Sequence, residues 1–364
     1  LATSLAQGEL KGWGSTSTCE YSITKWVNPL SRVLKRWYSH PKRVSKILKK
    51  DHDYSVLHVT DQEQAHLIPE HCPVPVVVTV HDLFHLFPER IKVGETSIEV
   101  GEQQPGWFRR RDLIKLRAGL ARADLLVCDS QATLSACQKH FPKVNSVCVP
   151  LGLDVKSFKP KPQEKTDILG PASHFVKKCH LLIVGSHAPR KRLKFLCQVL
   201  GGLDEEVKQN ILVHHVGNET CPYGGPSASA LSKKYGVEGW VSHGGELSSE
   251  ALMHLRHASE ALLFPSASEG FGYPPLEAMA CGTPVLSSDL PSHNELMPEE
   301  TCLRADDQDA WKEALLAVYS NWQSRTKNDE THVWQQPRSG LIEFASRYDQ
   351  SRFCLRMAEV YDSL

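Results

Sequence analysis

Short apolar runs alternate with longer amphipathic segments along most of the chain, and this alternation predicts strands and helices in turn. In the first half we predict strands at Tyr54–Thr60, Val76–Val80, Leu125–Cys128 and Ser146–Val149. Two helices are predicted beside them, at Phe108–Ala123 and Gln131–His140. Strands that are separated by helices of this length favour a parallel sheet, which is the architecture of α/β proteins.

A second series of the same kind follows residue 178. Its predicted strands are His180–Gly185, Ile211–Gly217, Gly239–His243, Ala261–Pro265 and Pro284–Ser287. Its predicted helices are Lys191–Leu200, Ser248–His257, Ala310–Trp322 and a closing helix at Leu341–Tyr361. The irregular, proline-bearing stretch between the two series predicts a linker. We therefore predict an α/β fold with two doubly wound domains, residues 1–153 and 179–340, joined by a linker at 154–178 and separated by a cleft.

Charge and cysteine content limit the classes of function. The 42 Lys and Arg residues balance the 42 Asp and Glu residues, so no overall field favours nucleic acid as a partner. No segment approaches the ~20 apolar residues of a membrane span. The 11 cysteines include no C-x-x-C pair, and several fall in elements predicted to be buried (Cys128, Cys148, Cys197 and Cys281). This usage predicts a reduced, cytoplasmic protein with no disulfide framework and no zinc site.

The most informative segment carries two carboxylates, Glu269 and Glu277, with seven residues between them. A predicted buried strand leads into it, and a glycine pair and a proline pair lie between the glutamates (Gly270, Gly272, Pro274 and Pro275). Tandem prolines suit the first turn of a helix, and Gly282 suits its end near Ala280. A loop of this kind that opens a helix can bind a diphosphate. The alternative is an ordinary turn with two solvated glutamates.

This segment resembles the E-x7-E signature of the retaining GT-B glycosyltransferases of the family 4 type. The resemblance implies two Rossmann-like domains and a closing helix, 341–364, that crosses back to the first domain. It also implies transfer of a sugar from a nucleotide-sugar donor to a glycan, lipid-linked or small-molecule acceptor, with retention at the anomeric carbon. No metal or other cofactor is expected. Glu277 would bind the donor ribose, Glu269 the sugar hydroxyls, and the backbone of Gly270, Phe271 and Gly272 the sugar and phosphate.

A second segment of the resemblance is the turn after the strand His180–Gly185. In the family, a Gly-Arg pair and a lysine at the helix start hold the donor diphosphate. Lys191 matches the lysine, Ser186 stands where the arginine is expected, and Arg190 is a candidate replacement. We expect Lys191, with Arg190, to stabilise the leaving diphosphate. The alternative is a solvated basic helix face formed by Lys191, Arg192 and Lys194.

Two histidines lie at the carboxyl ends of predicted strands. The stretch Val76–Leu83 resembles the family's VTVHDL segment, which implies that His81 lies near the reacting centre. The alternative is a structural histidine oriented by Asp82. His243 lies in the stretch Gly239–Gly244, which resembles the region that holds the nucleotide base, so His243 is a donor-binding candidate. We assign Ser130 to a helix N-cap and Ser292 with Glu295 to a capping box.

The first 50 residues depart from the family pattern. No apolar strand precedes Gly12-Trp-Gly14, the nearest candidate for the family's first Gly-rich loop, and the chain begins with Leu1, so we expect a fragment or a degenerate start. Arg32–Lys50 contains eight basic and no acidic residues, which predicts a solvated helix face or a peripheral membrane contact. These departures leave two alternatives open: a non-catalytic nucleotide-sugar-binding paralogue, and another GT-B enzyme such as a sugar-nucleotide epimerase or a phosphorylase.

Overall fold

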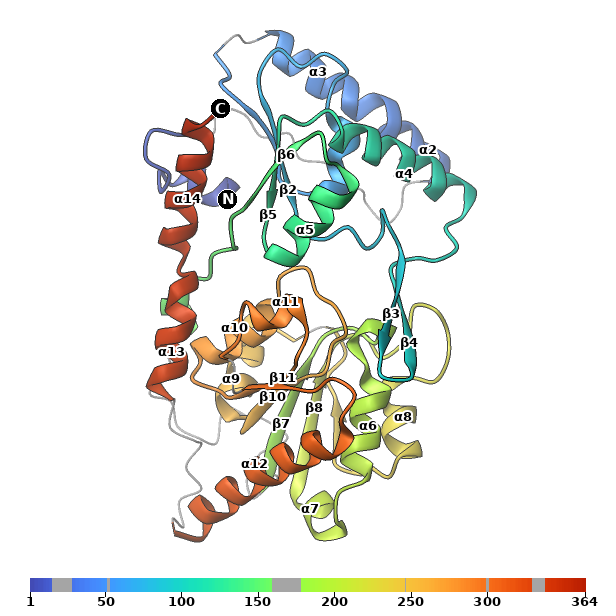
Figure 1. Cartoon of the computed structure of the whole chain (residues 1–364), viewed down its shortest axis with the longest axis vertical. Helices are drawn as coiled ribbons and strands as arrows, with labels where there is room; N and C mark the ends of the chain where they lie inside the picture. The colour runs from blue at the N-terminus through green and yellow to red at the C-terminus, as the bar shows by residue number, and fades with distance from the viewer. Residues whose placement is uncertain (15–27, 51–52, 159–177, 246, 299–300, 329–337) are drawn as a thin grey trace. The chain divides into compact units, whose positions relative to one another are not determined.

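The computed structural model describes residues 1–14, 28–50, 53–158, 178–245, 247–298, 301–328 and 338–364. Contacts between Cα atoms divide the chain into two compact units. Unit 1 comprises residues 1–89, 101–152 and 350–364, and unit 2 comprises residues 90–100 and 153–349. Each unit is an α/β structure with a parallel sheet, as the sequence pattern predicts (Figure 1).

The sheet of unit 1 has the strand order β1-β2-β5-β6. Its strands are β1 (Leu57–Val59), β2 (Val76–Val80), β5 (Leu125–Cys128) and β6 (Asn145–Cys148), and all neighbours are parallel. Strands β2 and β5 have the predicted bounds. Every residue of β2 is buried, because helices cover both faces of the sheet and a strand in that position needs apolar side chains on both sides.

Two helices cover one face of this sheet and one helix covers the other. Helices α4 (Trp107–Leu120) and α5 (Gln131–His140) share a core with β2 and β5 that includes Val78, Leu116 and Leu126. The opposite face packs against α14 (Gln350–Asp362) through Val77, Val127 and Met357. Helix α5 begins where Ser130 accepts a hydrogen bond from the Thr133 N–H, so the predicted N-cap is confirmed.

The basic segment of unit 1 is helical. It forms α2 (Pro29–Leu34), a π-helical turn at Lys35–Ser39 and α3 (His40–Lys50), and a short helix α1 (Ala2–Ala6) lies near the start of the chain. Helix α3 buries His40, Val44 and Leu48, which recur every four residues on one face. A 3-10 helix at Gln62–Leu67 packs against α4.

The sheet of unit 2 has the strand order β12-β11-β10-β7-β8-β9, and all its neighbours are parallel. Its strands are β7 (Cys179–Val184), β8 (Ile211–Val216), β9 (Trp240–Ser242), β10 (Ala261–Phe264), β11 (Val285–Ser288) and β12 (Cys302–Leu303). The five predicted strands of this half are confirmed within one or two residues at each end. The two-residue β12 is too short to leave a periodic signal.

The helices of unit 2 surround this sheet. They are α6 (Leu193–Gly201), α7 (Glu205–Asn210), α8 (Ala228–Lys234), α9 (Ser249–Ala258), α10 (Tyr273–Ala280), α11 (Pro291–Asn294), α12 (Gln308–Asn328) and α13 (Ser339–Ala345). One face of the sheet packs against α6, α8 and α12 around the fully buried Trp311. The predicted capping box is wrong: Leu290 is the N-cap of α11, so Ser292 lies inside the helix and Glu295 is its C-cap.

A β-hairpin that sequence reasoning missed belongs to unit 2. It consists of β3 (Glu89–Val93) and β4 (Thr96–Val100), and Val93 and Ile98 form a small core with Ala267 and Ala305. Its strands have mostly polar sequences, so only these distant contacts distinguish it from a loop. Residues 90–100 therefore pack with unit 2, although the predicted first domain runs from residue 1 to residue 153.

The end of the chain differs from the single predicted helix. Helix α13 ends at Ala345, a 3-10 turn follows at Ser346–Tyr348, and Asp349 is extended before α14 begins. The Tyr348 hydroxyl donates a hydrogen bond to the Glu295 carbonyl, which fixes the break. Helix α13 is part of unit 2, whereas α14 is part of unit 1.

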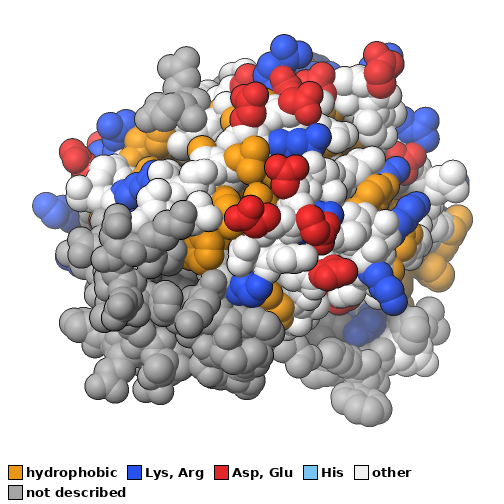
Figure 2. Space-filling model, turned by 90° about the horizontal axis from the view of Figure 1, so that it is seen from below, with side chains coloured by type: hydrophobic (Ala, Val, Ile, Leu, Met, Phe, Trp, Pro, Cys, Tyr) orange, Lys and Arg blue, Asp and Glu red, His pale blue; other side chains and the backbone are white. Residues whose placement is uncertain are grey.

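Surface charge matches the even composition. In the described part of the face shown in Figure 2, acidic and basic side chains are mixed. Cys128, Cys197 and Cys281 are buried free thiols, as predicted, whereas Cys148 is only half-buried. None of the described helices combines the length and the hydrophobicity that crossing a bilayer requires.

Candidate functional site

The carboxyl ends of two adjacent strands of unit 2 bring the predicted donor residues together. Strands β7 and β10 pair in parallel, with Leu182 opposite Leu262, so the loops that follow them meet at one edge of the sheet. The loop after β7 leads through Gly185 to a 3-10 turn at Pro189–Lys191. The loop after β10 leads through Glu269 to α10. Ligands of parallel α/β sheets bind at this edge.

Arg190, Lys191 and Glu269 form a tight ionic cluster at this edge. The Arg190 Nη1 and the Lys191 Nζ each lie 2.6 Å from a different oxygen of the Glu269 carboxylate. Arg190 also donates to the Ser268 carbonyl at 2.9 Å, and its own carbonyl accepts from the Ala267 N–H at 2.7 Å. Backbone and side-chain bonds together fix the loop of β7 to the loop of β10.

Burial and pairing set the protonation of this cluster. Burial alone would raise the pKa of Glu269, but the adjacent Lys191 and Arg190 outweigh it and hold the pKa at about 2. Burial lowers the pKa of Lys191, and Glu269 partly offsets that effect. Glu269 is therefore ionised at neutral pH. The cluster holds two cations and one anion, so it can attract a further negative charge.

Gly185 and Phe264 shape the space around the Lys191 side chain. Gly185 has a φ of +150°, and a Cβ at this position would lie 3.2 Å from the Lys191 Cε. The Lys191 Nζ lies 5.3 Å from the centre of the Phe264 ring, which suits a cation–π contact. Gly185, the end of the predicted strand, thus makes room for the lysine.

Helix α10 begins and ends as the sequence predicts. Gly272 is its N-cap with a φ of +111°, prolines occupy the first turn, and Gly282 follows the end at Ala280 with a φ of +76°. The Phe271 side chain is buried against Tyr273 and Tyr348, so any donor contact by Phe271 has to come from its backbone.

Glu277 lies on α10 and pairs with a cation that sequence reasoning did not identify. Its carboxylate accepts a hydrogen bond from the Arg256 guanidinium, which comes from α9 and is almost fully buried. Burial raises the pKa of Glu277, and Arg256 partly offsets that effect. The Glu277 side chain is 23% exposed, compared with 9% for the Glu269 side chain.

Arg192 is buried rather than solvated, which corrects one of the alternatives for the basic helix start. Its backbone has a φ of +54°, a left-handed conformation that is uncommon outside glycine. Its guanidinium donates to the carbonyls of Pro265 and Ala305 and stacks on Phe195. Lys191 is also largely buried, and Lys194 is exposed. Ser186 is exposed beside this turn.

Three histidines form a hydrogen-bonded chain on one face of the sheet of unit 2. His180 Nδ1 lies 2.8 Å from His214 Nε2, and His214 Nδ1 lies 2.9 Å from His243 Nε2. Burial lowers the pKa of His214 to about 3 and also lowers that of His243. The predicted base-binding residue His243 is thus the half-exposed end of a buried chain. Nothing in the sequence indicated this chain of histidines, because its members are 34 and 29 residues apart.

His81 lies in unit 1 and pairs with Asp129. The His81 Nδ1 is 3.1 Å from the Asp129 Oδ2, and its Nε2 is 3.2 Å from the Thr60 carbonyl. The hydrogen bond to Asp129 raises the pKa of His81, and burial raises the pKa of Asp129 to about 6. Asp82 instead accepts a hydrogen bond from the Phe84 N–H, so the orienting carboxylate is Asp129 and not Asp82.

Two family models match most of the chain. Residues 11–157 match the model described as Glycosyltransferase Family 4, and residues 165–331 match the model described as Glycosyl transferases group 1. The boundary between the two matches falls in the predicted linker.

Curated relatives and solved structures resemble the chain in part. The O-antigen chain mannosyltransferase RfbU of Salmonella typhimurium is 41% identical over 74 residues, 20% of this chain and 21% of that protein. The O-antigen chain mannosyltransferase B of Escherichia coli is 33% identical over 121 residues, 32% of this chain and 30% of that protein. The matches thus cover less than a third of either relative. The sucrose-phosphate synthase of Thermosynechococcus elongatus has the same fold, with a TM-score of 0.64, 20% identity and coverage of 95% of this chain and 84% of that chain.

Proposed function

Because the chain belongs to the family 4 type of GT-B glycosyltransferases, we propose that it transfers a sugar from a nucleotide-sugar donor to an acceptor, with retention at the anomeric carbon. The observation that carries this proposal is the cluster of Arg190, Lys191 and Glu269 at the carboxyl ends of β7 and β10. It supplies cations for a leaving diphosphate and an ionised carboxylate for sugar hydroxyls within one site.

The two cations of the cluster suit the departure of the diphosphate. As the bond to the sugar breaks, negative charge grows on the leaving phosphate oxygen, and a cation already in place stabilises that charge without reorganising. Lys191 is nearly buried, so its attraction is weakly screened by water. Arg190 can bind two oxygens at once through its planar guanidinium, which offsets the loss of the arginine that Ser186 replaces.

The two glutamates suit hydroxyl groups. An ionised carboxylate only accepts hydrogen bonds, and each oxygen has more than one lone pair. Glu269 already accepts from Lys191 and Arg190 and keeps capacity for a sugar hydroxyl. Glu277 accepts from Arg256 and keeps capacity for the ribose hydroxyls. The backbone of Gly270, Phe271 and Gly272 and the ring of His243 complete the proposed donor contacts.

His81 is the proposed contribution of unit 1 to the transfer. Asp129 fixes the orientation and the tautomer of its ring and favours the protonated form. A protonated imidazole can donate a hydrogen bond to a developing negative charge. We name His81, Glu269 and Lys191 as the residues that act on the reacting groups, and we propose that no metal ion takes part.

We propose a mannosyl donor, because both relatives with the highest identity reported above are named mannosyltransferases. The proposed acceptor is a glycan or a lipid-linked sugar, and peripheral contact of Arg32–Lys50 with a membrane would suit a lipid-linked acceptor. A cytoplasmic location remains part of the proposal.

Thermal shift with a panel of nucleotide sugars tests the donor, since a ligand stabilises the folded state by RT ln(1 + [L]/Kd). The panel includes GDP-mannose, UDP-glucose and UDP-N-acetylglucosamine. Release of the nucleoside diphosphate that depends on an added acceptor then tests transfer, and the anomeric configuration of the product by NMR tests retention. Donor binding with no release would favour the non-catalytic paralogue. The exposed Ser186, which stands where the family has an arginine, also favours that alternative. A donor converted without any acceptor would favour an epimerase.

A further inference from the structure

The chain of His180, His214 and His243 crosses one face of the sheet of unit 2 and ends at the edge where ligands bind. Strands β7 and β8 pair with Leu181 opposite Val213, and both of these residues belong to the core that packs against α6, α8 and α12. Because side chains alternate along a strand, His180 and His214 point to the opposite face. His243 directly follows β9, so it lies at the carboxyl end of that strand. The chain thus connects the buried middle of the sheet to its ligand-binding edge.

The three rings have the geometry of a continuous hydrogen-bonded chain. The planes of His180 and His214 differ by 10°, and those of His214 and His243 differ by 21°. In both pairs the ring centres are 5.1 Å apart, and the facing nitrogen atoms are 2.8 and 2.9 Å apart. These distances are those of N–H···N hydrogen bonds between rings that lie end to end.

His214, the middle ring, is neutral and surrounded by apolar neighbours. Leu182 on β7 and Val241 on β9 lie beside it in the register of the sheet. It is 0% exposed, and burial lowers its pKa to about 3. Among the described residues, its ring has hydrogen bonds only to the other two histidines. One of its nitrogens must therefore donate and the other accept.

A neutral chain of this kind has only two hydrogen-bonding patterns. If His243 donates through Nε2, His214 must donate through its own Nε2 to His180, and the His243 Nδ1 is an acceptor. In the reverse pattern every ring carries its proton on Nδ1, and the His243 Nδ1 is a donor. The first pattern uses the Nε2–H form throughout, which is the intrinsically preferred tautomer of neutral histidine. Burial also lowers the pKa of His243, which favours its neutral form.

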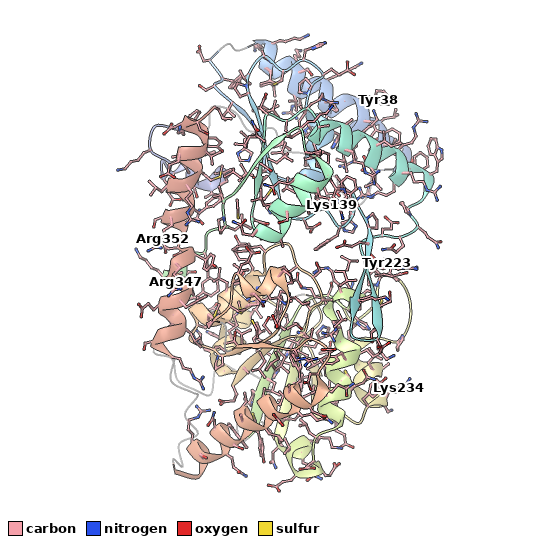
Figure 3. The ribbon with its side chains drawn as sticks, in the orientation of Figure 1. Tyr38, Lys139, Tyr223, Lys234, Arg347 and Arg352 are labelled. Carbon is pink, nitrogen blue, oxygen red and sulfur yellow. The ribbon has the colours of Figure 1, made fainter. Side chains whose placement is uncertain are left out.

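The free end of the chain is open to a ligand. The His243 Nδ1 has no hydrogen-bond partner among the described residues, and it is accessible on a half-buried ring. An exposed aromatic ring belongs to the same edge of the sheet. Figure 3 labels Tyr223, which is 47% exposed, on the loop that follows β8. Exposed aromatic rings are surfaces on which a base can stack.

We propose that His180 and His214 set the tautomer of His243, and that the His243 Nδ1 accepts the ring N–H of the donor base. Guanine carries this hydrogen at N1 and uracil at N3, whereas the corresponding nitrogens of adenine and cytosine are themselves acceptors. His180 and His214 are thus positioning residues that select guanine or uracil through His243. This inference rests on the proposed donor site and deepens it, because it names the class of base.

The tautomer is tested by NMR on the full chain labelled with 15N at histidine. Correlation of the ring nitrogens with the ring carbon-bound hydrogens distinguishes a protonated from an unprotonated nitrogen, and His243→Asn assigns the signals of His243. We expect a single tautomer for His243, protonated at Nε2, at pH 7.5. In His214→Leu, which keeps an apolar side chain of similar size between its neighbours, we expect a mixture of the two tautomers.

The base is tested by calorimetry with GDP and ADP as a purine pair and with UDP and CDP as a pyrimidine pair. In the pair that binds more tightly, the base with the N–H should bind about 10-fold better, because its competitor places one acceptor against another. His214→Leu should lose most of this preference. His214→Gln should keep it, because the amide can accept from His243 and donate to His180. The control His66→Leu removes a buried histidine from unit 1 and should leave the preference unchanged.

Two results would overturn the role of the histidines and leave the donor site intact. One is a His243 that carries its proton on Nδ1 in the unchanged protein. The other is nucleotide binding with no preference within a pair, or with the same preference in His214→Leu. A protein that binds none of the four nucleotides would contradict the donor site itself, and this inference with it.

Discussion

Replacing Glu269 with glutamine should destabilise unit 2, because this single carboxylate neutralises both Arg190 and Lys191. Glu269 is 8% exposed, and each of its oxygens lies 2.6 Å from a different cation. The amide keeps the shape of the side chain and removes its charge. Lys191 and Arg190 would then face each other in a largely buried site with no anion between them, so the variant isolates electrostatics from packing.

Two estimates of the loss agree. The pKa of Glu269 is about 2, some 2.5 units below its ordinary value of 4.5. At 1.36 kcal/mol per unit, this corresponds to about 3 kcal/mol in favour of the ionised form. Removing one partner of a buried ion pair costs ~3–5 kcal/mol by experience with other proteins. We therefore expect the free energy of unfolding of unit 2 to fall by about 3 kcal/mol.

Urea unfolding followed by fluorescence and circular dichroism measures this loss. Trp311 is fully buried in the core of unit 2 and reports on its transition. A double-mutant cycle with Lys191→Met should show a coupling of ~1–3 kcal/mol, because the lysine has less to lose once the glutamate is gone. The matched control is Glu205→Gln, which removes a carboxylate that pairs with Lys208 on the surface at 2.8 Å. It should leave the midpoint unchanged.

A loss for Glu269→Gln no larger than that of Glu205→Gln would refute the reasoning. It would mean that water or rearranged side chains compensate for the buried cations. A large loss with no coupling to Lys191 would instead assign the effect to Arg190 alone.

Four further predictions concern the donor site, the metal and the response to pH. Glu277→Ala should weaken donor binding by ~1.5–3 kcal/mol, because a hydrogen bond to a charged group is lost, and it should also lower the stability of unit 2, because the buried Arg256 loses its carboxylate partner; unchanged affinity in calorimetry would contradict the ribose assignment. Lys191→Ala should lower kcat more than it raises KM, since its charge acts as the diphosphate leaves; a silent Lys191→Ala beside a harmful Arg190→Ala would move that role to Arg190. A chelator should leave transfer intact, and loss of activity that manganese restores would contradict the expectation of a metal-free site. Burial lowers the pKa values of His58, His66 and His214 to about 3, 4 and 3, so the unfolded chain binds more protons below pH 6.5. Stability should be full above that pH and should fall toward pH 4 by about 1.4 kcal/mol per pH unit for each histidine, as denaturant titrations at several pH values can measure.

The sequence predicted those elements whose signal is local. Strands β2 and β5 are buried on both faces, so each is a short continuous apolar run with clear ends. Helix α10 has prolines in its first turn and Gly272 and Gly282 at its two ends, where the backbone takes positive φ values. These residues restrict the backbone by themselves, whatever surrounds them. The same holds for Ser130, whose side chain caps the helix that follows it.

The partners of the charged residues could not be predicted, because they come from distant parts of the chain. Asp129 is 48 residues from His81, and Arg256 is 21 residues from Glu277. Lys191, Arg192 and Lys194 look alike in the sequence, and only the packed sheet decides that Arg192 is buried and Lys194 exposed.

The sequence by itself determined the two α/β series and the residues at the carboxyl ends of their strands, because hydrophobic periodicity and Gly and Pro act over a few residues. The tertiary structure alone decided which of these residues meet. It joined Arg190 and Lys191 to Glu269 across two parallel strands, placed the polar hairpin β3–β4 on unit 2, and broke the closing helix at Tyr348. Each of these outcomes depends on contacts between segments far apart in the chain. Burial strengthens the charge pairs and the hydrogen bond, which solvent would weaken, and removal of apolar surface from water holds the hairpin.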